Sequence, residues 1–186
     1  MTALLRFDNV ACRRGGRLLF EALNLHIGAG DALHLGGPNG SGKSSLIRLA
    51  AGLLRADAGT IERAELALAD EALALDRELP LRRALAFWSA DARRLEEALD
   101  ALDLTRLDHV PVRLLSMGQA KRATLARVAA STAPLWLLDE PLNGMDRAGV
   151  EQLEALVAAH LSSGGAVLAA SHAPLGGTWT HMELGA

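Results

Sequence analysis

The sequence predicts an α/β domain with a mainly parallel core sheet, and three observations lead to this prediction. Short apolar runs alternate along the chain with longer segments of helical periodicity. The runs Leu135–Leu138 and Ala166–Ala170 are unbroken, which is typical of strands buried on both faces of a parallel sheet. A glycine-rich stretch, Gly37 to Ser44, lies between one predicted strand and one predicted helix. Together these features favour a doubly wound core.

The first quarter of the chain contains three predicted strands and the first predicted helix. Residues Ala3–Val10 and Leu18–Ile27 read as strands, and the turn signals at Arg13–Gly16 lie between them. Asp31–Leu35 is a shorter strand that runs into the glycines. Ser44–Leu54 has apolar residues at helical spacing, so we expect a helix there. The order strand, loop, helix places the glycine-rich stretch at a helix N-terminus.

The rest of the chain continues with a turn, an insert of short helices and then a return to alternating strands and helices. We expect the turn at Asp57–Gly59. The later predictions are helices at Leu81–Trp88, Arg93–Leu104, Gly118–Ser131 and Arg147–Leu161, and strands at Leu135–Leu138 and Ala166–Ala170. The helices from about residue 80 to 132 form a helical insert. Because we find no linker and no internal repeat, we expect residues 1–186 to form a single domain.

The composition excludes several classes of protein. The chain has 186 residues, half of them apolar, and 19 Lys and Arg stand against 22 Asp and Glu. This balance disfavours both a disordered chain and a nucleic-acid-binding protein. The single cysteine, Cys12, cannot form an internal disulfide, which fits a reducing compartment. The cytoplasm is the expected location.

No segment of the sequence reads as a membrane span or as a signal peptide. Met1–Phe7 lacks a basic region and a long apolar region, so we expect no signal peptide there. The longest apolar runs fall well short of the roughly 20 residues that cross a bilayer. If the protein works in transport, another chain must therefore supply the path through the membrane.

The stretch Gly37 to Ser44 reads GPNGSGKS and matches the phosphate-binding pattern GxxxxGK[ST]. Its glycines allow backbone amides to point toward a phosphate, and the helix that follows adds its positive end. We expect Lys43 to reach the β- and γ-phosphates of a nucleotide and the Ser44 hydroxyl to ligate Mg²⁺. The expected nucleotide-binding residues of this stretch are Gly37, Pro38, Asn39, Gly40, Ser41, Gly42, Lys43, Ser44 and Ser45.

An acid pair follows the apolar run Leu135–Leu138, about a hundred residues after the phosphate loop. Asp139 is the candidate for a second Mg²⁺ ligand. Glu140 comes directly after it, where a carboxylate can orient or deprotonate the water that attacks the γ-phosphate. An isolated acid pair after a strand usually lies in a solvated turn. Because this chain also contains a phosphate loop, the catalytic interpretation is favoured.

Two further stretches resemble the ATP-binding cassette superfamily. Residues 115–119 read LSMGQ and are followed by the basic helical AKRATLARV, and residues 141–146 read PLNGMD directly after the acid pair. The resemblance extends from about Leu4 to Glu183. It implies a phosphate-loop NTPase fold of the ABC type, with an N-terminal antiparallel β subdomain and a small α-helical subdomain. It also implies ATP hydrolysis by a dimer.

The resemblance assigns roles to residues outside the phosphate loop. The signature residues that would face the partner subunit's ATP are Ser116, Met117, Gly118 and Gln119. His172, in ASHAP, matches the switch histidine that contacts the γ-phosphate. The resemblance thus implies Glu140, His172 and Lys43 as catalytic residues, with ATP and Mg²⁺ as ligands.

The chain departs from the superfamily pattern at two points. It has no tyrosine, and the place of the aromatic residue that stacks on adenine is taken by Arg13 or Arg14; a guanidinium can stack on a base, and we expect Arg14 to do so. No glutamine lies between Lys43 and Gln119, where one normally links Mg²⁺ to the membrane partner. Asp70 or Glu71 occupies about that place and could reach a metal-bound water.

Within the superfamily, the chain resembles the ATP-binding subunits of the haem-handling exporters of cytochrome c maturation. The similar stretches are CRRGGRLLF from Cys12, LPLRRALAFW from Leu79 and SHAPL from Ser171. This resemblance implies integral membrane permease partners of the CcmB and CcmC kind and a peripheral position on the cytoplasmic face of the inner membrane. His26, His34, His109, His160 and His181 are scattered in the sequence and form no haem-ligand pattern.

Three other functions compete with this interpretation. The chain could serve another ABC exporter, or it could be a soluble cassette ATPase that acts as a mechanical switch. Such switches usually join two cassettes or insert long coiled coils, and this chain has neither feature. A nucleotide kinase would explain the phosphate loop but would leave LSMGQ unexplained.

Overall fold

The computed structural model describes residues 3–173 and 175–185. Met1 and Thr2, at the start of the segment tested for a signal peptide, and Pro174 of the SHAPL stretch lie outside the described residues. The described chain divides into two compact units. The first contains the residues up to Leu68, Ala133–Pro141 and the residues from His160 onward, and the second contains Ala69–Thr132 and Leu142–Ala159.

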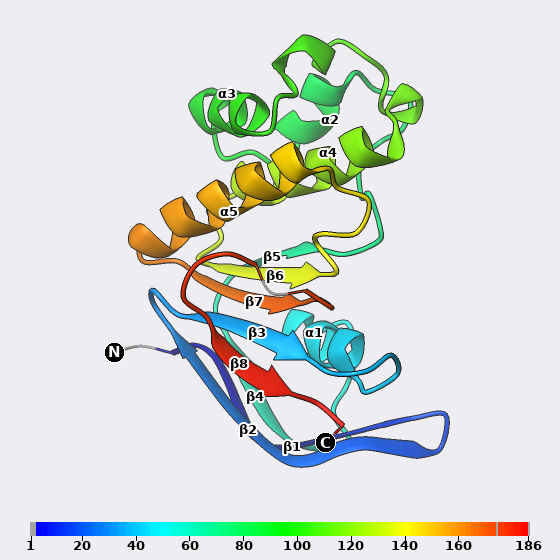
Figure 1. Cartoon of the computed structure of the whole chain (residues 1–186), viewed down its shortest axis with the longest axis vertical. Helices are drawn as coiled ribbons and strands as arrows, with labels where there is room; N and C mark the ends of the chain where they lie inside the picture. The colour runs from blue at the N-terminus through cyan, green and yellow to red at the C-terminus, as the bar shows by residue number, and fades with distance from the viewer. Residues whose placement is uncertain (1–2, 174, 186) are drawn as a thin grey trace. The chain divides into compact units, whose positions relative to one another are not determined.

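An antiparallel sheet of order β2-β1-β4 belongs to the first unit (Figure 1). Its strands are β1 (Ala3–Arg14), β2 (Arg17–Gly28) and β4 (Ala58–Arg63). The first two strands are longer than the sequence predicted, because they continue to a tight turn at Gly15 and Gly16, both with positive φ. This sheet confirms the antiparallel β subdomain that the resemblance implied.

A five-stranded sheet of order β5-β6-β7-β3-β8 contains the predicted parallel strands. The strands are β3 (Ala32–Gly36), β5 (Leu66–Ala69), β6 (Leu135–Asp139), β7 (Ala166–Ala170) and β8 (Thr180–Glu183). The pairs β3 with β7, β3 with β8 and β6 with β7 are all parallel. Every residue of β3, β6 and β7 is buried, as the apolar runs predicted.

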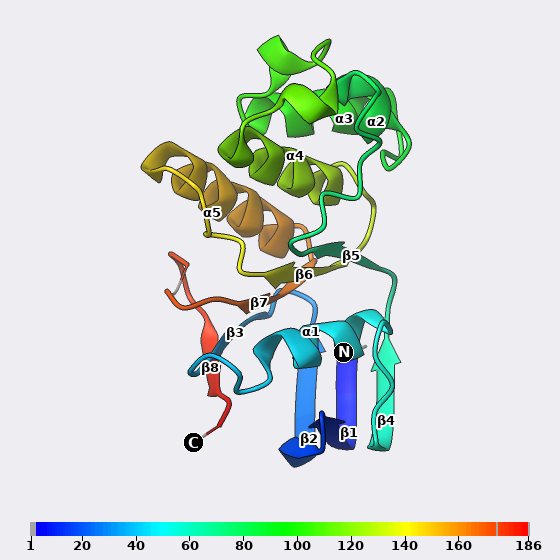
Figure 2. The same ribbon diagram turned by 90° about the vertical axis from the view of Figure 1, so that its right-hand side faces the viewer.

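Helix α1 (Lys43–Ala51) lies between the two sheets of the first unit (Figure 2). Leu46 and Ile47 are fully buried, in one core cluster with Phe7 of the antiparallel sheet and Leu137 of the parallel sheet. Burial of such side chains stabilises the fold by about 1.5–3 kcal/mol each. The two sheets therefore hold the start of α1 firmly in place.

Helix α1 ends three residues before the predicted end at Leu54. Gly52 adopts φ +76° and donates its N–H to carbonyls of the last turn, which is the usual glycine C-cap. The Arg63 guanidinium from β4 donates to the carbonyls of Leu49 and Ala50, which satisfies two further acceptors of the helix end. The apolar pattern continues to Leu54, beyond the cap, so the pattern alone overestimated the length of the helix.

The second unit contains the helices of the predicted insert together with most of a later helix. They are α2 (Leu81–Ala86), α3 (Ala92–Ala101), α4 (Met117–Ala129), the 3-10 helices Thr105–Leu107 and Val112–Leu114, and most of α5 (Arg147–Ser162). Arg82 of α2 bonds both Glu96 of α3 and Asp108. These bonds raise the pKa of Arg82 and lower the pKa of both carboxyls.

The predicted turn at Asp57–Gly59 is wrong, because β4 begins at Ala58. Gly59 has φ +83°, and a side chain there would lie 2.4 Å from the carbonyl oxygens of Asp8 and Asn9. It therefore marks an irregular pairing of β4 with β1, where the register shifts between Asp8 and Ala11. Among the described residues, no helix is both long and apolar enough to span a membrane.

Candidate nucleotide-binding site

The glycine-rich stretch forms a loop between β3 and α1, as predicted. Gly37, Gly40 and Gly42 all have positive φ. A side chain on Gly37 would lie 2.4 Å from the Leu184 carbonyl oxygen and 2.9 Å from Ser41 Oγ, so this position requires glycine. Gly42 is the N-cap of α1 and makes no side-chain cap bond. The first N–H groups of α1 are therefore available to an anion such as a phosphate.

Lys43 and Ser41 place a cation and a hydroxyl inside this loop. Lys43 is only 6% exposed, and its Nζ donates to the carbonyls of Gly37 at 2.7 Å and Pro38 at 3.2 Å. Ser41 is also buried, and its Oγ has no hydrogen-bond partner among the described residues. A buried ammonium and an unsatisfied hydroxyl in a loop of glycines form a cradle suited to a polyphosphate.

Ser44 and Asp139 lie side by side although they are far apart in the sequence. Ser44 Oγ donates to Asp139 Oδ1 at 3.1 Å, so the start of α1 meets the end of β6. Both groups are oxygen ligands of the kind that Mg²⁺ prefers. Among residues 3–173 and 175–185, no group of three or more His, Cys, Asp or Glu could hold a metal ion. A hydroxyl and one carboxylate fit Mg²⁺, which takes its remaining ligands from phosphates and water.

Glu140 directly follows Asp139 and has an unusual backbone conformation. Its φ is +48°, which is strained for a residue with a side chain. Its N–H still donates to the Ala170 carbonyl at 2.8 Å, so the turn begins within the sheet ladder. The Glu140 side chain is 19% exposed, and its Oε1 lies 3.6 Å from Nε2 of His172, which is 53% exposed. The parallel sheet thus brings together Glu140 and His172, to which the sequence pattern and the family resemblance respectively gave predicted roles in catalysis.

The predicted signature residues stand at the start of α4. Ser116 is the N-cap of this helix, where its Oγ accepts from the Gln119 N–H at 3.3 Å. Gln119 Oε1 accepts from the Ser116 N–H at 2.9 Å, which completes a capping box. Met117 is 88% exposed. The S-x-x-Q spacing in the sequence is typical of a capping box. The helix begins at Met117, one residue before the predicted start at Gly118.

Gly144 of the PLNGMD stretch packs against the signature within the second unit. A side chain on Gly118 would lie 3.4 Å from the Gly144 carbonyl oxygen. Asp146 Oδ1 accepts from the Gly149 N–H at 2.9 Å and so caps the start of α5. The signature residues and Leu142–Asp146 belong to the second unit, whereas Lys43, Glu140 and Pro141 belong to the first.

Arg14 ends β1 at the tip of the β1–β2 hairpin, and its side chain is exposed. Phe20 of β2 lies next to the phosphate loop and has an aromatic ring. The sequence analysis did not propose it as an adenine-stacking residue. A side chain on Gly42 would lie 3.4 Å from Phe20 Cε1 and 3.3 Å from Leu19 Cβ. The hairpin therefore flanks the start of α1 with apolar groups.

The two acids proposed in place of the missing glutamine have different environments. Glu71 is exposed, while Asp70 is half-buried and accepts from the Ala72 N–H at 3.0 Å. Burial lowers the pKa of the Arg127 guanidinium, and the charge of Asp70 opposes that shift. Arg127 also lies over the Trp88 ring, 4.8 Å from its centroid. Asp70 therefore has a charge partner within the second unit.

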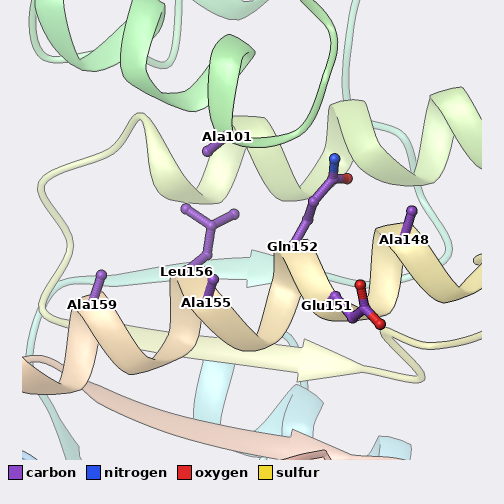
Figure 3. A pocket seen from close by; sticks show the side chains of 7 residues that line it. All are labelled: Ala101, Ala148, Glu151, Gln152, Ala155, Leu156 and Ala159. Carbon is purple, nitrogen blue, oxygen red and sulfur yellow. The ribbon is translucent and has the colours of Figure 1, made fainter.

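A hollow of about 580 Å³ lies over α5 (Figure 3). Its lining residues are Ala101, Ala148, Glu151, Gln152, Ala155, Leu156 and Ala159. Most of them are alanines, and Glu151 forms an ion pair with Arg147 at 2.9 Å. None of the predicted site residues lines this hollow, and it offers no cation for a phosphate.

The phosphate loop, the signature, the acid pair and the candidate switch histidine follow one another in this order along the chain, and together with the fold they define a class of ATPase. Residues 20–143 match the family model described as ABC transporter. An ATP-binding subunit of an ABC transporter has the same fold, with a TM-score of 0.84, 23% identity and coverage of 91% of this chain and 79% of that one. An ABC transporter ATP-binding protein from Pyrococcus furiosus also has a TM-score of 0.84, at 19% identity, with coverage of 97% and 96%. This chain therefore belongs to the ABC transporter family, as an ATPase subunit.

Curated relatives narrow the assignment within that family. The "Cytochrome c biogenesis ATP-binding export protein CcmA" of Sphingopyxis alaskensis is 58% identical, covering 92% of this chain and 91% of the relative. The protein of that name in Novosphingobium aromaticivorans is 59% identical, with coverage of 90% and 87%, and that of Pseudomonas putida is 40% identical, with 92% and 90%. The chain is thus a CcmA-like ATPase of cytochrome c biogenesis, and the kinase and soluble-switch alternatives are excluded.

Proposed function

We propose that this ATPase hydrolyses ATP at a site built by Lys43, Ser44, Asp139, Glu140 and His172. The observation that carries the proposal is the 3.1 Å hydrogen bond from Ser44 to Asp139, with the Glu140 carboxylate next in the chain. It joins a phosphate loop to a metal-binding acid and a candidate base. Lys43 and the N–H groups of the loop would bind the phosphates.

Ser44 and Asp139 would hold Mg²⁺, which when bound neutralises charge on the β- and γ-phosphates. Glu140 would accept a proton from the attacking water while the water oxygen bonds to the γ-phosphorus. The bond between that phosphorus and the β–γ bridging oxygen then breaks, giving ADP and phosphate. His172, within 3.6 Å of Glu140, would contact the γ-phosphate.

The second half of each active site would come from another copy of the chain. Ser116, Met117, Gly118 and Gln119 stand at the N-terminus of α4, where N–H groups favour an anion. Exposure of Met117 suits a surface that meets a partner. We propose a homodimer in which each signature closes on the ATP held by its partner's phosphate loop.

Mixing two inactive variants tests the shared site. K43A leaves the signature intact, and S116R leaves the phosphate loop intact, so each homodimer should be inactive. Heterodimers would contain one whole site and one doubly damaged site. We expect the ATPase rate to peak between the two pure variants as their ratio changes, with subunit exchange verified by a mass-tagged copy. A flat line at the level of the inactive variants would contradict either the shared site or turnover by a single whole site.

In the cell, we propose that this ATPase drives a haem-related export step of cytochrome c maturation. Its partners would be integral membrane permease subunits of the CcmB and CcmC kind, and it would sit at the cytoplasmic face of the inner membrane. The names of the relatives support this assignment, because they state export and cytochrome c biogenesis. Copurification with such permeases, and loss of mature cytochrome c in cells that carry K43A, would test it. Normal cytochrome c in those cells would contradict the role.

We also propose that Arg14 stacks on adenine and that Asp70 or Glu71 reaches a metal-bound water in place of the missing glutamine. The exposed hairpin tip leaves the Arg14 guanidinium available to a base. Glu71 is exposed, whereas Asp70 is half-buried and its charge acts on Arg127, which favours Glu71 for this role.

A further inference from the structure

Two histidines that looked scattered in the sequence form a pair on neighbouring strands. His34 of β3 is in register with His181 of β8 and, on its other side, with Ala169 of β7. The two rings meet edge to face with centroids 5.2 Å apart, and their Nδ1 atoms are 3.2 Å apart. His34 is only 6% exposed, whereas His181 is exposed. The pair thus connects the buried sheet with the surface.

The second ring nitrogen of His34, Nε2, contacts Ser171, the residue that follows β7. His34 Nε2 lies 3.0 Å from the carbonyl oxygen of Ser171 and 3.0 Å from its Oγ. A carbonyl oxygen can only accept, so Nε2 must carry a hydrogen. Ser171 Oγ gives its own hydrogen to the Ala173 carbonyl and can therefore accept as well. His34 is thus a donor to both oxygens of Ser171.

This bonding places a hydrogen on Nε2 of His34 and leaves Nδ1 to face His181. In the neutral Nε2–H form of His34, Nδ1 has a lone pair that accepts, and His181 donates its Nδ1–H across the 3.2 Å contact. His181 therefore orients the His34 ring from the opposite side. A buried polar ring that is bonded at both nitrogens has a defined orientation and resists displacement.

Ser171 directly precedes His172, the residue proposed to contact the γ-phosphate. The β7 strand ends at Ala170, so Ser171 is the first residue beyond the sheet ladder. Ser171 is 1% exposed while His172 beside it is 53% exposed. We propose that His34, oriented by His181, is a positioning residue that fixes the Ser171 peptide and thereby aims His172 at the nucleotide. This inference rests on the role proposed for His172.

Kinetics of three variants test the inference. H34L removes both polar contacts, and H34Q keeps an amide donor at about the distance of Nε2. We expect H34L to lower kcat roughly tenfold, the fold-change that corresponds to one lost buried hydrogen bond, with ATP affinity unchanged. H34Q should recover most of the rate. The control is H26L, a histidine exposed on β2, which should behave as wild type.

A double variant separates this inference from the proposed function. If His34 acts through His172, then H34L should add little to the loss caused by H172A, because the two effects are not independent. A slow H172A with a wild-type H34L would overturn the positioning role alone. A wild-type H172A would overturn the role of His172 and the inference together. Additive losses would show that His34 acts elsewhere.

Nitrogen-15 NMR of the histidine rings gives a readout that does not depend on activity. We expect His34 in the Nε2–H tautomer and His181 in the Nδ1–H tautomer in the wild-type protein, and the His172 ring signal should shift in H34L but not in H26L. This measurement decides the question even if H34L is too unstable for kinetics. A His34 ring in the Nδ1–H tautomer would overturn the proposal.

Discussion

Replacing Glu140 with glutamine should nearly stop ATP hydrolysis while ATP binding persists. The amide keeps the shape of the side chain but cannot accept the proton of the attacking water. A general base typically contributes a factor of about 10² to 10⁴, which corresponds to roughly 2.7–5.4 kcal/mol of transition-state stabilisation. We expect at least a roughly hundredfold loss of kcat.

The structure explains why this substitution should leave the fold intact. The N–H of Glu140 donates to the Ala170 carbonyl whichever side chain is present, and φ +48° suits glutamine no worse than glutamate. The side chain is 19% exposed, so the amide does not enter a dry core. We expect the free energy of unfolding to change by no more than about 0.5 kcal/mol.

Phosphate release measured with saturating ATP, together with equilibrium binding of a non-hydrolysable ATP analogue, checks this prediction. E151Q is the matched control, because it makes the same chemical change at an exposed position on α5. Hydrolysis by E140Q within a few-fold of wild type would refute the base assignment. Loss of analogue binding would instead show that Glu140 holds the nucleotide.

K43A should raise the dissociation constant of an ATP analogue at least roughly tenfold, because it removes the buried cation of the phosphate loop; equal affinity would refute the loop assignment. R14A should weaken ATP binding modestly and R14Y should restore it, while equal affinity in all three forms would show that adenine is held elsewhere. Burial lowers the pKa of His160, which stacks on Trp136 and bonds the Pro134 carbonyl. Since the unfolded chain then binds the proton more readily, the free energy of unfolding should fall as pH drops below about 6.5. H160F should flatten this dependence in urea titrations, and equal slopes would contradict it.

Chemistry that depends on neighbours in the chain was predictable from the sequence. The phosphate loop and the acid pair are continuous stretches whose residue types and spacing predicted a function, and LSMGQ acquired its predicted role from the family resemblance. The strand Ala166–Ala170 was predicted with the bounds observed, because a fully buried strand appears as an unbroken apolar run. Such runs predicted the α/β core, and the resemblance of LSMGQ and PLNGMD to the ATP-binding cassette superfamily implied the ABC fold class.

Short exposed strands were not predictable. Strands β4 and β8 contain few buried residues, so their sequences show no apolar run or clear alternation. They are strands because β1 and β3 offer them edges to pair with. The end of α1 was likewise decided by Gly52 and by Arg63 reaching over from β4, which no local pattern contains.

The sequence by itself predicted which residues bind and cleave a nucleotide, because the loop, the acids and the signature are each short continuous stretches with a recognisable pattern. Tertiary structure alone decided which of them meet. Ser44 and Asp139 are 95 residues apart in the chain, and His34 and Ser171 are 137 apart, yet each pair is hydrogen-bonded. The physical reason is the parallel sheet, which aligns the ends of strands that are distant in sequence at one edge.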